Sequence, residues 1–194
     1  MLRENVIDLL CENVLMHIND PAIYEIWDQL TELLSNNVDD TIKYLKSCNK
    51  KELFYLSSVF EDIALKVQSK KYIQTLYELN EKYPDLNMLN DIELAEQCTN
   101  IGNKNEFYKF RSKIRKPLGR TVLFEEDREK YEMEIISLLK ENKDITCNYI
   151  MFSTDNELAA LKTVLKSYFA KNNDDELFKI ITELSISKPQ LNLL

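Results

Sequence analysis

The 194-residue sequence predicts an all-α protein of about ten or eleven helices, stacked in an α-solenoid-like arrangement or packed as bundles. Only two glycines, Gly102 and Gly119, and four prolines occur in it. A sheet protein of this size needs many tight turns with residues of positive φ, which are mostly glycines, whereas short polar connections between helices need few. A hydrophobic content of 44% with 30% charged residues is typical of a folded protein.

An internal repeat is the second observation behind this fold. A shift of 105 positions aligns residues 25–89 with residues 130–194 without a gap, and 17 of the 65 aligned pairs are identical. The identical pairs include Leu33/Leu138, Leu34/Leu139, Asn37/Asn142, Tyr44/Tyr149, Glu52/Glu157 and Leu79/Leu184. Both copies also end in the same Pro-x-Leu-Asn-x-Leu. We therefore predict two divergent copies of one helical unit.

Four helices are predicted in each unit. The first helix of the N-terminal unit begins at Asp20, a suitable N-cap, with Pro21 in the first turn, where its missing N–H costs nothing. Its apolar residues recur at helical spacing: Ile23, Ile26, Trp27, Leu30, Leu33 and Leu34. A second, short helix is predicted over residues 39–47.

The third helix opens with Asn49-x-x-Glu52, whose counterpart in the second copy is Thr154-x-x-Glu157. Both have the pattern of a capping box, in which the two side chains satisfy the free backbone N–H groups of the first turn. Ser69 is the expected cap of the fourth helix, which ends at Pro84. Spacing of i, i+3 and i+7 predicts a buried face on the third helix made of Leu53, Leu56, Phe60, Ile63 and Val67.

Two segments belong to neither copy. One helix is predicted over residues 2–18, and one or two helices rich in lysine and arginine over residues 90–116, broken at Pro117. We expect the parts of the chain to form one compact protein. The predicted organisation is an N-terminal helical unit with its leading helix (1–89), a basic helical linker (90–124) and a C-terminal helical unit (125–194).

The net charge of −8 is unevenly distributed. Residues 1–89 carry −6 and residues 125–194 carry −5, whereas residues 90–124 carry +3. An acidic body repels nucleic-acid backbones and attracts cationic partners. Because no signal peptide and no membrane-length apolar run occurs, a cytoplasmic location without membrane contact is expected. The four scattered cysteines are expected to be free, buried thiols.

No catalytic or metal-binding motif occurs in the sequence. Two glycines leave no phosphate-cradling loop, and adjacent carboxylates such as Asp39 and Asp40 diverge on a helix instead of converging in a cleft. The single histidine, His17, shares a helix face with apolar residues, so we interpret it as a packed or surface residue rather than a catalytic base. We therefore expect no enzyme activity, no cofactor and no metal.

The basic stretch over residues 104–116 allows two interpretations. Its lysines and arginines alternate with aromatic residues, which is typical of a nucleic-acid contact through phosphates and stacking. Its residues Phe107, Phe110 and Ile114 also stand at i, i+3 and i+7, the spacing of an ordinary core stripe with a solvated basic face. Because the remainder of the chain is acidic, we favour the core stripe over the nucleic-acid contact.

A candidate partner-binding surface lies on the third helix of the first unit. Exposed aromatic side chains anchor a partner, and carboxylates steer a basic one. The alternative is a central helix that packs on both faces. At about 100° per residue, the side opposite the predicted core face holds Phe54, Ser58, Glu61, Asp62 and Leu65, with Tyr55 at its margin. The second copy has small or basic residues there: Ala159, Thr163, Lys166, Ser167 and Ala170.

The run from Glu52 to Ile63 reads Glu-Leu-Phe-Tyr-Leu-Ser-Ser-Val-Phe-Glu-Asp-Ile, and it is followed by Lys66-Val-Gln-Ser and by Leu76-x-x-Leu-x-x-Lys-Tyr-Pro. This pattern resembles the helical immunity proteins of bacterial polymorphic-toxin and contact-dependent growth inhibition systems, in particular the immunity protein 30 family. The similarity covers residues 25–86, with a weaker echo over residues 125–191. Its matching positions are mostly apolar or helix-boundary residues.

The resemblance implies a protein that binds a cognate toxin, often a nuclease, and blocks it. No fixed inhibitory residues carry over, and of the matched positions Glu61 and Asp62 are suited to contact with a basic active site. The expected function is therefore an immunity protein that occludes a toxin domain, a basic nuclease in this hypothesis, with an acidic helical surface. The alternative is a helical-repeat scaffold or adaptor that binds another protein.

Overall fold

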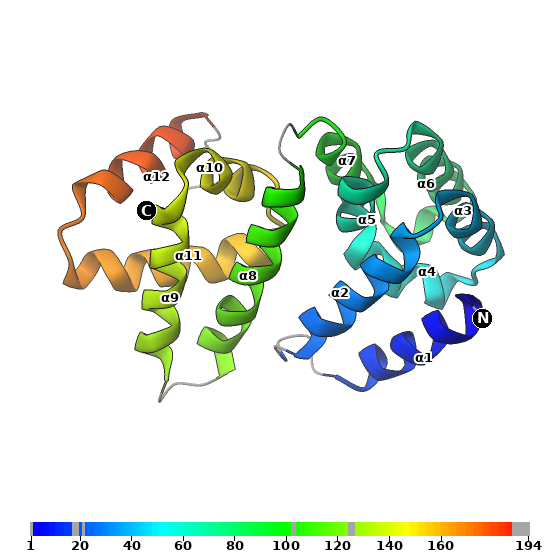
Figure 1. Ribbon diagram of the computed structural model, residues 1–194, viewed down its shortest axis with the longest axis horizontal. Helices are drawn as coiled ribbons and strands as arrows, with labels where there is room; N and C mark the ends of the chain where they lie inside the picture. The colour runs from blue at the N-terminus through cyan, green and yellow to red at the C-terminus, as the bar shows by residue number, and fades with distance from the viewer. Residues whose placement is uncertain (1, 17–19, 21, 102–103, 124–126, 188–194) are drawn as a thin grey trace. The chain divides into compact units, whose positions relative to one another are not determined.

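The computed structural model describes residues 2–16, 20, 22–101, 104–123 and 127–187. These residues form twelve α-helices and two short 3-10 turns, η1 and η2, and none of them lies in a β-strand (Figure 1). Since α4, η1 and α5 follow one another without a break, the described residues contain eleven helical segments. The predicted all-α fold is confirmed. The predictions for His17, Pro21 and the final Pro-x-Leu-Asn-x-Leu lie outside the described residues.

The chain divides into two compact units. Unit 1 comprises residues 1–18 and 22–108, and unit 2 comprises residues 19–21 and 109–194. Unit 1 contains α1 (Leu2–Leu15), α2 (Ala22–Ser35), α3 (Val38–Ser47), α4 (Lys50–Leu56), η1 (Ser57–Val59), α5 (Phe60–Val67), α6 (Lys70–Lys82), η2 (Pro84–Leu86), α7 (Leu89–Cys98) and the first five residues of α8 (Lys104–Leu123). Unit 2 contains the remainder of α8, α9 (Arg128–Glu141), α10 (Lys143–Met151), α11 (Asp155–Lys171) and α12 (Asp175–Ser187).

The two copies of the repeat adopt the same arrangement of helices. The starts of α3, α4 and α6 lie 105 residues before the starts of α10, α11 and α12, and α6 and α12 also end 105 residues apart. The packing partners correspond as well, because α3 contacts α2 and α6, and α10 contacts α9 and α12 (Figure 1). Likewise α2 packs on α5, and α9 packs on α11.

The starts of α4 and α11 are fixed by the side chains that the sequence indicated. Asn49 and Glu52 form a capping box, in which the Asn49 side chain accepts from the Glu52 N–H at 3.0 Å and Glu52 accepts from the Asn49 N–H at 2.8 Å. Thr154 and Glu157 repeat this box at the start of α11. Asn37 and its counterpart Asn142 cap α3 and α10. Both predicted boxes are confirmed.

A threonine hydrogen bond recurs in both units. The Thr41 hydroxyl donates to the Leu34 carbonyl at 2.5 Å, and the Thr146 hydroxyl donates to the Leu139 carbonyl at 2.7 Å. Each bond satisfies a carbonyl near the end of one helix with a buried side chain from the next.

Replacing Thr41 or Thr146 by valine is therefore expected to lower the free energy of unfolding by about 1 kcal/mol in each case, because a buried carbonyl loses its partner while the volume is kept. Urea denaturation of the two variants tests this. Clearly unequal losses would show that the two hydrogen bonds are not equivalent in energy.

The N-terminal helix has a counterpart in unit 2, contrary to the prediction that it belongs to neither copy. Buried residues of α1 and α8 correspond at a spacing of 108, namely Val6/Ile114, Leu10/Leu118 and Asn13/Thr121. Each helix also brings arginine to the capping-box glutamate of its unit. Arg3 Nη2 lies 3.0 Å from Glu52 Oε1, and Arg115 Nε lies 2.7 Å from Glu157 Oε1. The C-terminal part of α8 is thus the first helix of the second copy.

The predicted basic linker, residues 90–124, is accordingly divided between the units, with α7 in unit 1 and most of α8 in unit 2. The break predicted at Pro117 does not occur, since α8 continues to Leu123 with Pro117 inside it. An internal proline costs one backbone hydrogen bond, and the burial of Pro117 and Leu118 offsets that loss.

Candidate functional site

Phe54 on α4 is the exposed member of the predicted partner-binding surface. Its side chain is 56% exposed, and it lies edge-on against Tyr55 with 5.3 Å between ring centroids. Tyr55 and Ser58 are half-buried. A large aromatic side chain held open to solvent is the kind of residue that fills a partner's pocket.

Glu61, Asp62 and Leu65 on α5 are 1%, 2% and 2% exposed, so the exposure predicted for them is wrong. The prediction assumed a regular α-helix with about 100° per residue. It fails because the helix tightens into the 3-10 turn η1, where Val59 has φ −122° and ψ 7°. A 3-10 turn advances about 120° per residue, which turns α5 away from the direction expected from α4. In addition, α5 packs against both α2 and α7, as the alternative of a central helix requires.

The two buried carboxylates act on tyrosines of unit 1. Burial raises the pKa of Tyr72 well above its ordinary value, and the nearby Glu61 and Asp62 raise it further. Burial likewise raises the pKa of Tyr108, and Asp28, which accepts a hydrogen bond from the Tyr108 hydroxyl at 3.4 Å, and Asp62 add to that rise. Glu61 and Asp62 therefore belong to the interior electrostatics of unit 1 and do not present a steering charge.

Carboxylates close to Phe54 come from α7 instead. The Ser57 hydroxyl donates to the Phe54 carbonyl at 2.9 Å. Burial raises the pKa of Asp91, in the first turn of α7, and a hydrogen bond with Ser57 partly offsets that rise. Ser57 thus joins the start of α7 to the residues around the exposed ring. We call Phe54, Tyr55, Ser58 and Asp91 the Phe54 surface.

The outer side of α7 is acidic. Glu93 and Glu96 are exposed, and no lysine or arginine occurs between residues 89 and 98. The Tyr77 hydroxyl donates to Glu96 Oε2 at 2.8 Å, and this hydrogen bond raises the pKa of Tyr77 to about 12. The acidic character of this helix was missed in the sequence analysis because its three carboxylates were counted within a basic linker. Counting charge over ten residues at a time separates the acidic helix from the basic segment that follows it.

The core stripe favoured for the basic segment is confirmed. Phe107, Phe110 and Ile114 on α8 are buried, and the Phe110 ring lies edge-on against Tyr149 with 5.7 Å between centroids. Lys109 and Lys113 on the same helix are exposed. The buried aromatic residues and the exposed lysines together explain the alternation of basic and aromatic residues that also suggested a nucleic-acid contact.

Two arginines of this segment are buried in a network at the start of α11. Arg111 Nη2 lies 3.3 Å from Glu157 Oε2, and Arg115 Nε lies 2.7 Å from Glu157 Oε1. Their side chains are 1% and 4% exposed, so neither presents its charge to a phosphate. Burial alone would raise the pKa of Glu157, but Arg115 and Arg111 outweigh it and hold that pKa far below its usual range.

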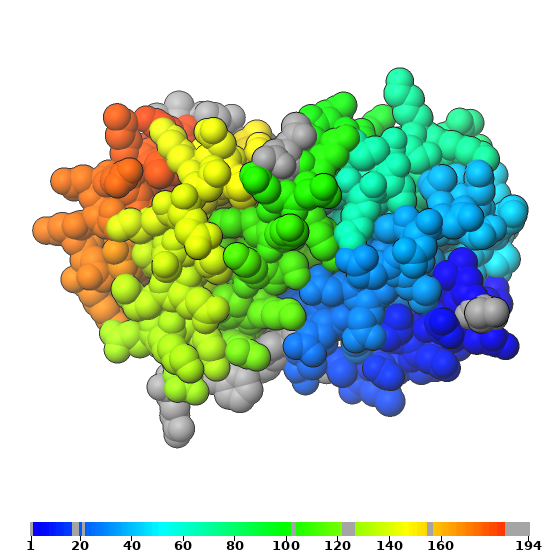
Figure 2. Space-filling model, in the orientation of Figure 1, coloured from blue at the N-terminus to red at the C-terminus, as the bar shows by residue number. Residues whose placement is uncertain are grey.

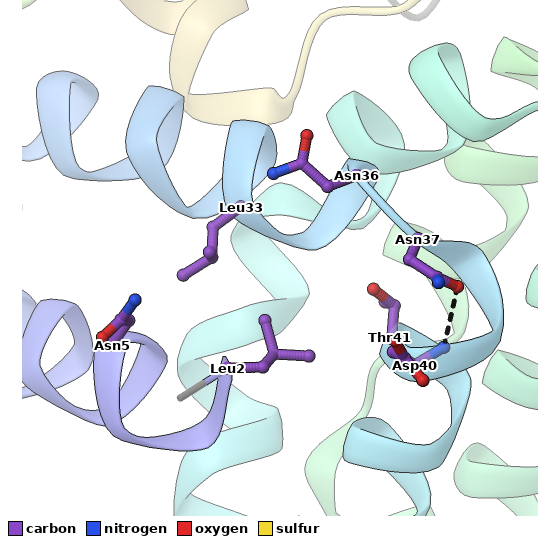
Figure 3. A pocket seen from close by; sticks show the side chains of 7 residues that line it. All are labelled: Leu2, Asn5, Leu33, Asn36, Asn37, Asp40 and Thr41. Atoms are coloured by element: carbon purple, nitrogen blue, oxygen red, sulfur yellow. Dashed lines mark hydrogen bonds between the residues drawn. The ribbon is translucent and has the colours of Figure 1, made fainter.

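A shallow pocket of about 230 Å³ lies between α1, α2 and α3 in unit 1 (Figure 3). The side chain of Asn37 caps α3 there and accepts a hydrogen bond from the Asp40 N–H at 3.2 Å. Thr41 in the same pocket is engaged with Leu34. Asn37 and Thr41 thus serve the local helix boundary, and we assign the pocket no ligand. The residues around it are Leu2, Asn5, Leu33, Asn36, Asn37, Asp40 and Thr41.

In the part of the chain that the structure describes, no group of three or more histidine, cysteine, aspartate or glutamate side chains is placed to hold a metal ion. No described helix has both the length and the apolar character needed to cross a bilayer. The four cysteines form no disulfide, as predicted, and Cys48 and Cys98 are buried. The burial predicted for all four is wrong for Cys11, which is exposed, and Cys147 is only partly buried.

Comparison with known proteins found no match: no family model fits the sequence, and no curated protein or solved structure is significantly similar to it. The resemblance to the immunity protein 30 family therefore stays a hypothesis.

Proposed function

We propose that this chain is a cytoplasmic, non-enzymatic immunity protein that binds a cognate bacterial toxin domain, a nuclease, and blocks it by occlusion. The observation that carries the proposal is the Phe54 surface, an exposed aromatic ring beside the acidic helix α7 in a chain of net charge −8. A nuclease site is cationic because it binds phosphates, so an acidic helical surface can take the place of the nucleic-acid backbone. Charge complementarity speeds the encounter, and an anchored ring slows dissociation.

The steering charge in this proposal belongs to Asp91, Glu93 and Glu96 on α7 rather than to α5. Glu61 and Asp62 are buried, so reversing their charge would test folding and not docking. Glu93 and Glu96 are exposed, so they remain solvated in the free protein and are available to a cationic partner, whereas Asp91 is half-buried beside Ser57.

Replacing Phe54 by alanine is expected to weaken binding of the toxin domain by about 30-fold, because central aromatic anchors contribute about 2 kcal/mol or more. The partner for this test is the toxin domain encoded by the reading frame next to this gene. Titration calorimetry of the purified pair measures the dissociation constant, and growth of a host that expresses the toxin reports protection.

The matched control is Met133→Ala, which removes an exposed apolar side chain of unit 2 that is 51% exposed. Its dissociation constant should stay within about threefold of the unmodified chain, and both variants should keep the melting temperature. Failure of the unmodified chain to bind or protect against any neighbouring toxin would refute the immunity function. Unchanged affinity in Phe54→Ala alone would place the interface elsewhere.

The second candidate function is a helical-repeat scaffold or adaptor, which the five corresponding helices of the two units favour. Repeat proteins bind through faces that are shared by successive units. Under that hypothesis affinity capture should recover a protein encoded outside the neighbourhood of this gene, and co-expression with the neighbouring toxin should give no protection.

A further inference from the structure

Helices α11 and α12 of unit 2 correspond to the helices of unit 1 that α7 covers. In unit 1, α7 packs on α5 and α6. Its buried residues Ile92 and Ala95 join the core together with Ala64 of α5 and Ile73 of α6, which are 0% and 6% exposed.

The positions of Ala64 and Ile73, buried on the two helices that α7 packs on, are aromatic in unit 2. Phe169 of α11 stands at the position of Ala64, and Phe178 of α12 stands at the position of Ile73. Phe169 is half-buried and Phe178 is 47% exposed. Their rings lie edge-on with 5.4 Å between centroids. We call the face formed by these two rings between α11 and α12 the α11–α12 groove, and Figure 2 shows side chains of these helices, in orange, on the surface of unit 2.

The groove is held in place by its own polar support. The Tyr168 hydroxyl, next to Phe169, donates to Asp174 Oδ2 at 2.8 Å, and Lys140 Nζ lies 2.8 Å from the same oxygen. The Asp174 side chain also accepts from the Leu177 N–H at 3.2 Å, which caps α12. Because the corner between the two helices is fixed before binding, little ordering cost remains for a ligand that lies in it.

The rim of the groove has changed from neutral or acidic to basic. Lys162 and Lys166 on α11 replace Ser57 and Glu61 of unit 1. In unit 1, Ser57 is the residue that hydrogen-bonds with Asp91 of α7. A helix bound to unit 2 in the same way would therefore bring a carboxylate to Lys162. Neither lysine has an ion-pair partner among the residues that the structure describes.

We propose that the α11–α12 groove is a docking site for an acidic amphipathic helix of a protein partner, bound as α7 is bound in unit 1. The apolar side of that helix covers Phe169 and Phe178, and its carboxylates lie against Lys162 and Lys166. This site is separate from the Phe54 surface, and it does not require the partner to be a toxin. A helix in a groove is one of the recurring modes of peptide recognition, and α7 supplies the geometry for it within the same chain.

The test uses a synthetic peptide of residues 88–101, the α7 segment, with Cys98 replaced by alanine to prevent oxidation. Titrated into the full chain labelled with ¹⁵N, the peptide should shift the amide signals of α11 and α12 with a dissociation constant below about 1 mM. Lys162→Glu plus Lys166→Glu should weaken binding about tenfold, since two charge pairs are reversed. Phe178→Ala should weaken it by a similar factor.

A charge exchange separates docking from a general loss of structure. A peptide with lysine at positions 91, 93 and 96 should bind the unmodified chain poorly and regain affinity, to within about threefold, for the Lys162→Glu, Lys166→Glu chain.

Four outcomes would overturn the proposal. Absence of shifts up to about 1 mM peptide would leave Phe169 and Phe178 as a simple cover of the core, and shifts confined to unit 1 would mean that the peptide competes with α7. Self-association of the chain that Phe178→Ala abolishes would assign the groove to a second copy, and displacement of the peptide by a tighter-binding single-stranded oligonucleotide would assign it to nucleic acid.

Discussion

Replacing Glu157 by alanine is expected to lower the free energy of unfolding by about 3–5 kcal/mol, because it removes a buried carboxylate that pairs with two buried arginines. Arg111 and Arg115 both contact Glu157, and all three side chains are at most 5% exposed. The substitution also removes the capping-box acceptor for the Thr154 N–H, which Glu157 Oε2 binds at 2.8 Å.

The duplication supplies the control. Glu52→Ala removes the equivalent carboxylate of unit 1, whose partner Arg3 is 48% exposed, so water replaces the lost pair and the expected cost is about 1 kcal/mol. Urea denaturation gives the two losses, and hydrogen exchange should show lost protection in α8 and α11 for Glu157→Ala. Equal losses for the two variants would contradict the argument that burial decides the cost.

Glu157 also gives a pH dependence whose sign follows from its lowered pKa. The folded pKa lies far below the ordinary value of 4.5, so the unfolded chain takes up the proton first. Its contribution to stability is therefore complete above about pH 4.5 and is lost as the pH falls below that value. Glu157→Gln cannot ionise, so the difference in stability between it and the unmodified chain should shrink between pH 7 and pH 3. A constant difference would mean that Glu157 has the same pKa in the folded and unfolded chains, contrary to the lowered folded pKa.

The helix boundaries of this protein could be predicted because they depend on local chemistry. Each capping box consists of hydrogen bonds within a single first turn, between Asn49 and Glu52 in α4 and between Thr154 and Glu157 in α11. Such a pattern is readable three residues at a time. The repeat was readable for a related reason, since the connections within residues 25–89 and 130–194 have equal lengths and no gap hides the correspondence.

The first helix of the second copy was hidden by a change in loop length. Helices α1 and α8 end 108 residues apart, at Leu15 and Leu123, whereas α2 and α9 start 106 residues apart, at Ala22 and Arg128. A comparison without gaps at 105 therefore cannot align α1 with α8. Their common role is visible only when Arg3 and Arg115 are seen to bond to corresponding glutamates.

The candidate site was predicted only in part. Phe54 was placed correctly at the surface, because α4 begins at a secure cap and is short. Glu61 and Asp62 were misplaced, because the 3-10 turn between α4 and α5 lies within a sequence that keeps its apolar spacing. Which helix covers α5 is a tertiary property, and neither the composition of α5 nor that of α7 indicates it.

Residue differences between the two copies indicate which positions are exposed in one unit only. In the sequence analysis the copies were compared in this way only on the third helix of the first unit. The exchange of Ala64 for Phe169 and of Ile73 for Phe178 puts large aromatic residues where small or aliphatic residues stand in the other unit. Such an exchange is consistent with a core position in one copy and a surface position in the other. The structure confirms this for Ile73 and Phe178, which are 6% and 47% exposed.

Replacing Ile73 by alanine is accordingly expected to lower the free energy of unfolding by about 2–5 kcal/mol, because a cavity is left in the close-packed core of unit 1. Phe178→Ala removes a larger side chain from the corresponding position of unit 2, yet its expected cost is below about 1 kcal/mol, since the ring is already hydrated. Chemical denaturation of the two variants measures this reversal of the usual size order.

The comparison is informative because both residues occupy the same place on equivalent helices, so helix propensity and backbone geometry nearly cancel. If Phe178→Ala costs as much as Ile73→Ala, some part of unit 2 covers the α11–α12 groove in solution, and the proposed docking site is closed. If Phe178→Ala lowers the free energy of unfolding only slightly in the free chain but clearly weakens binding of an acidic helix, the groove is an interface. The same substitution thus reports on folding in the free chain and on recognition in the bound one.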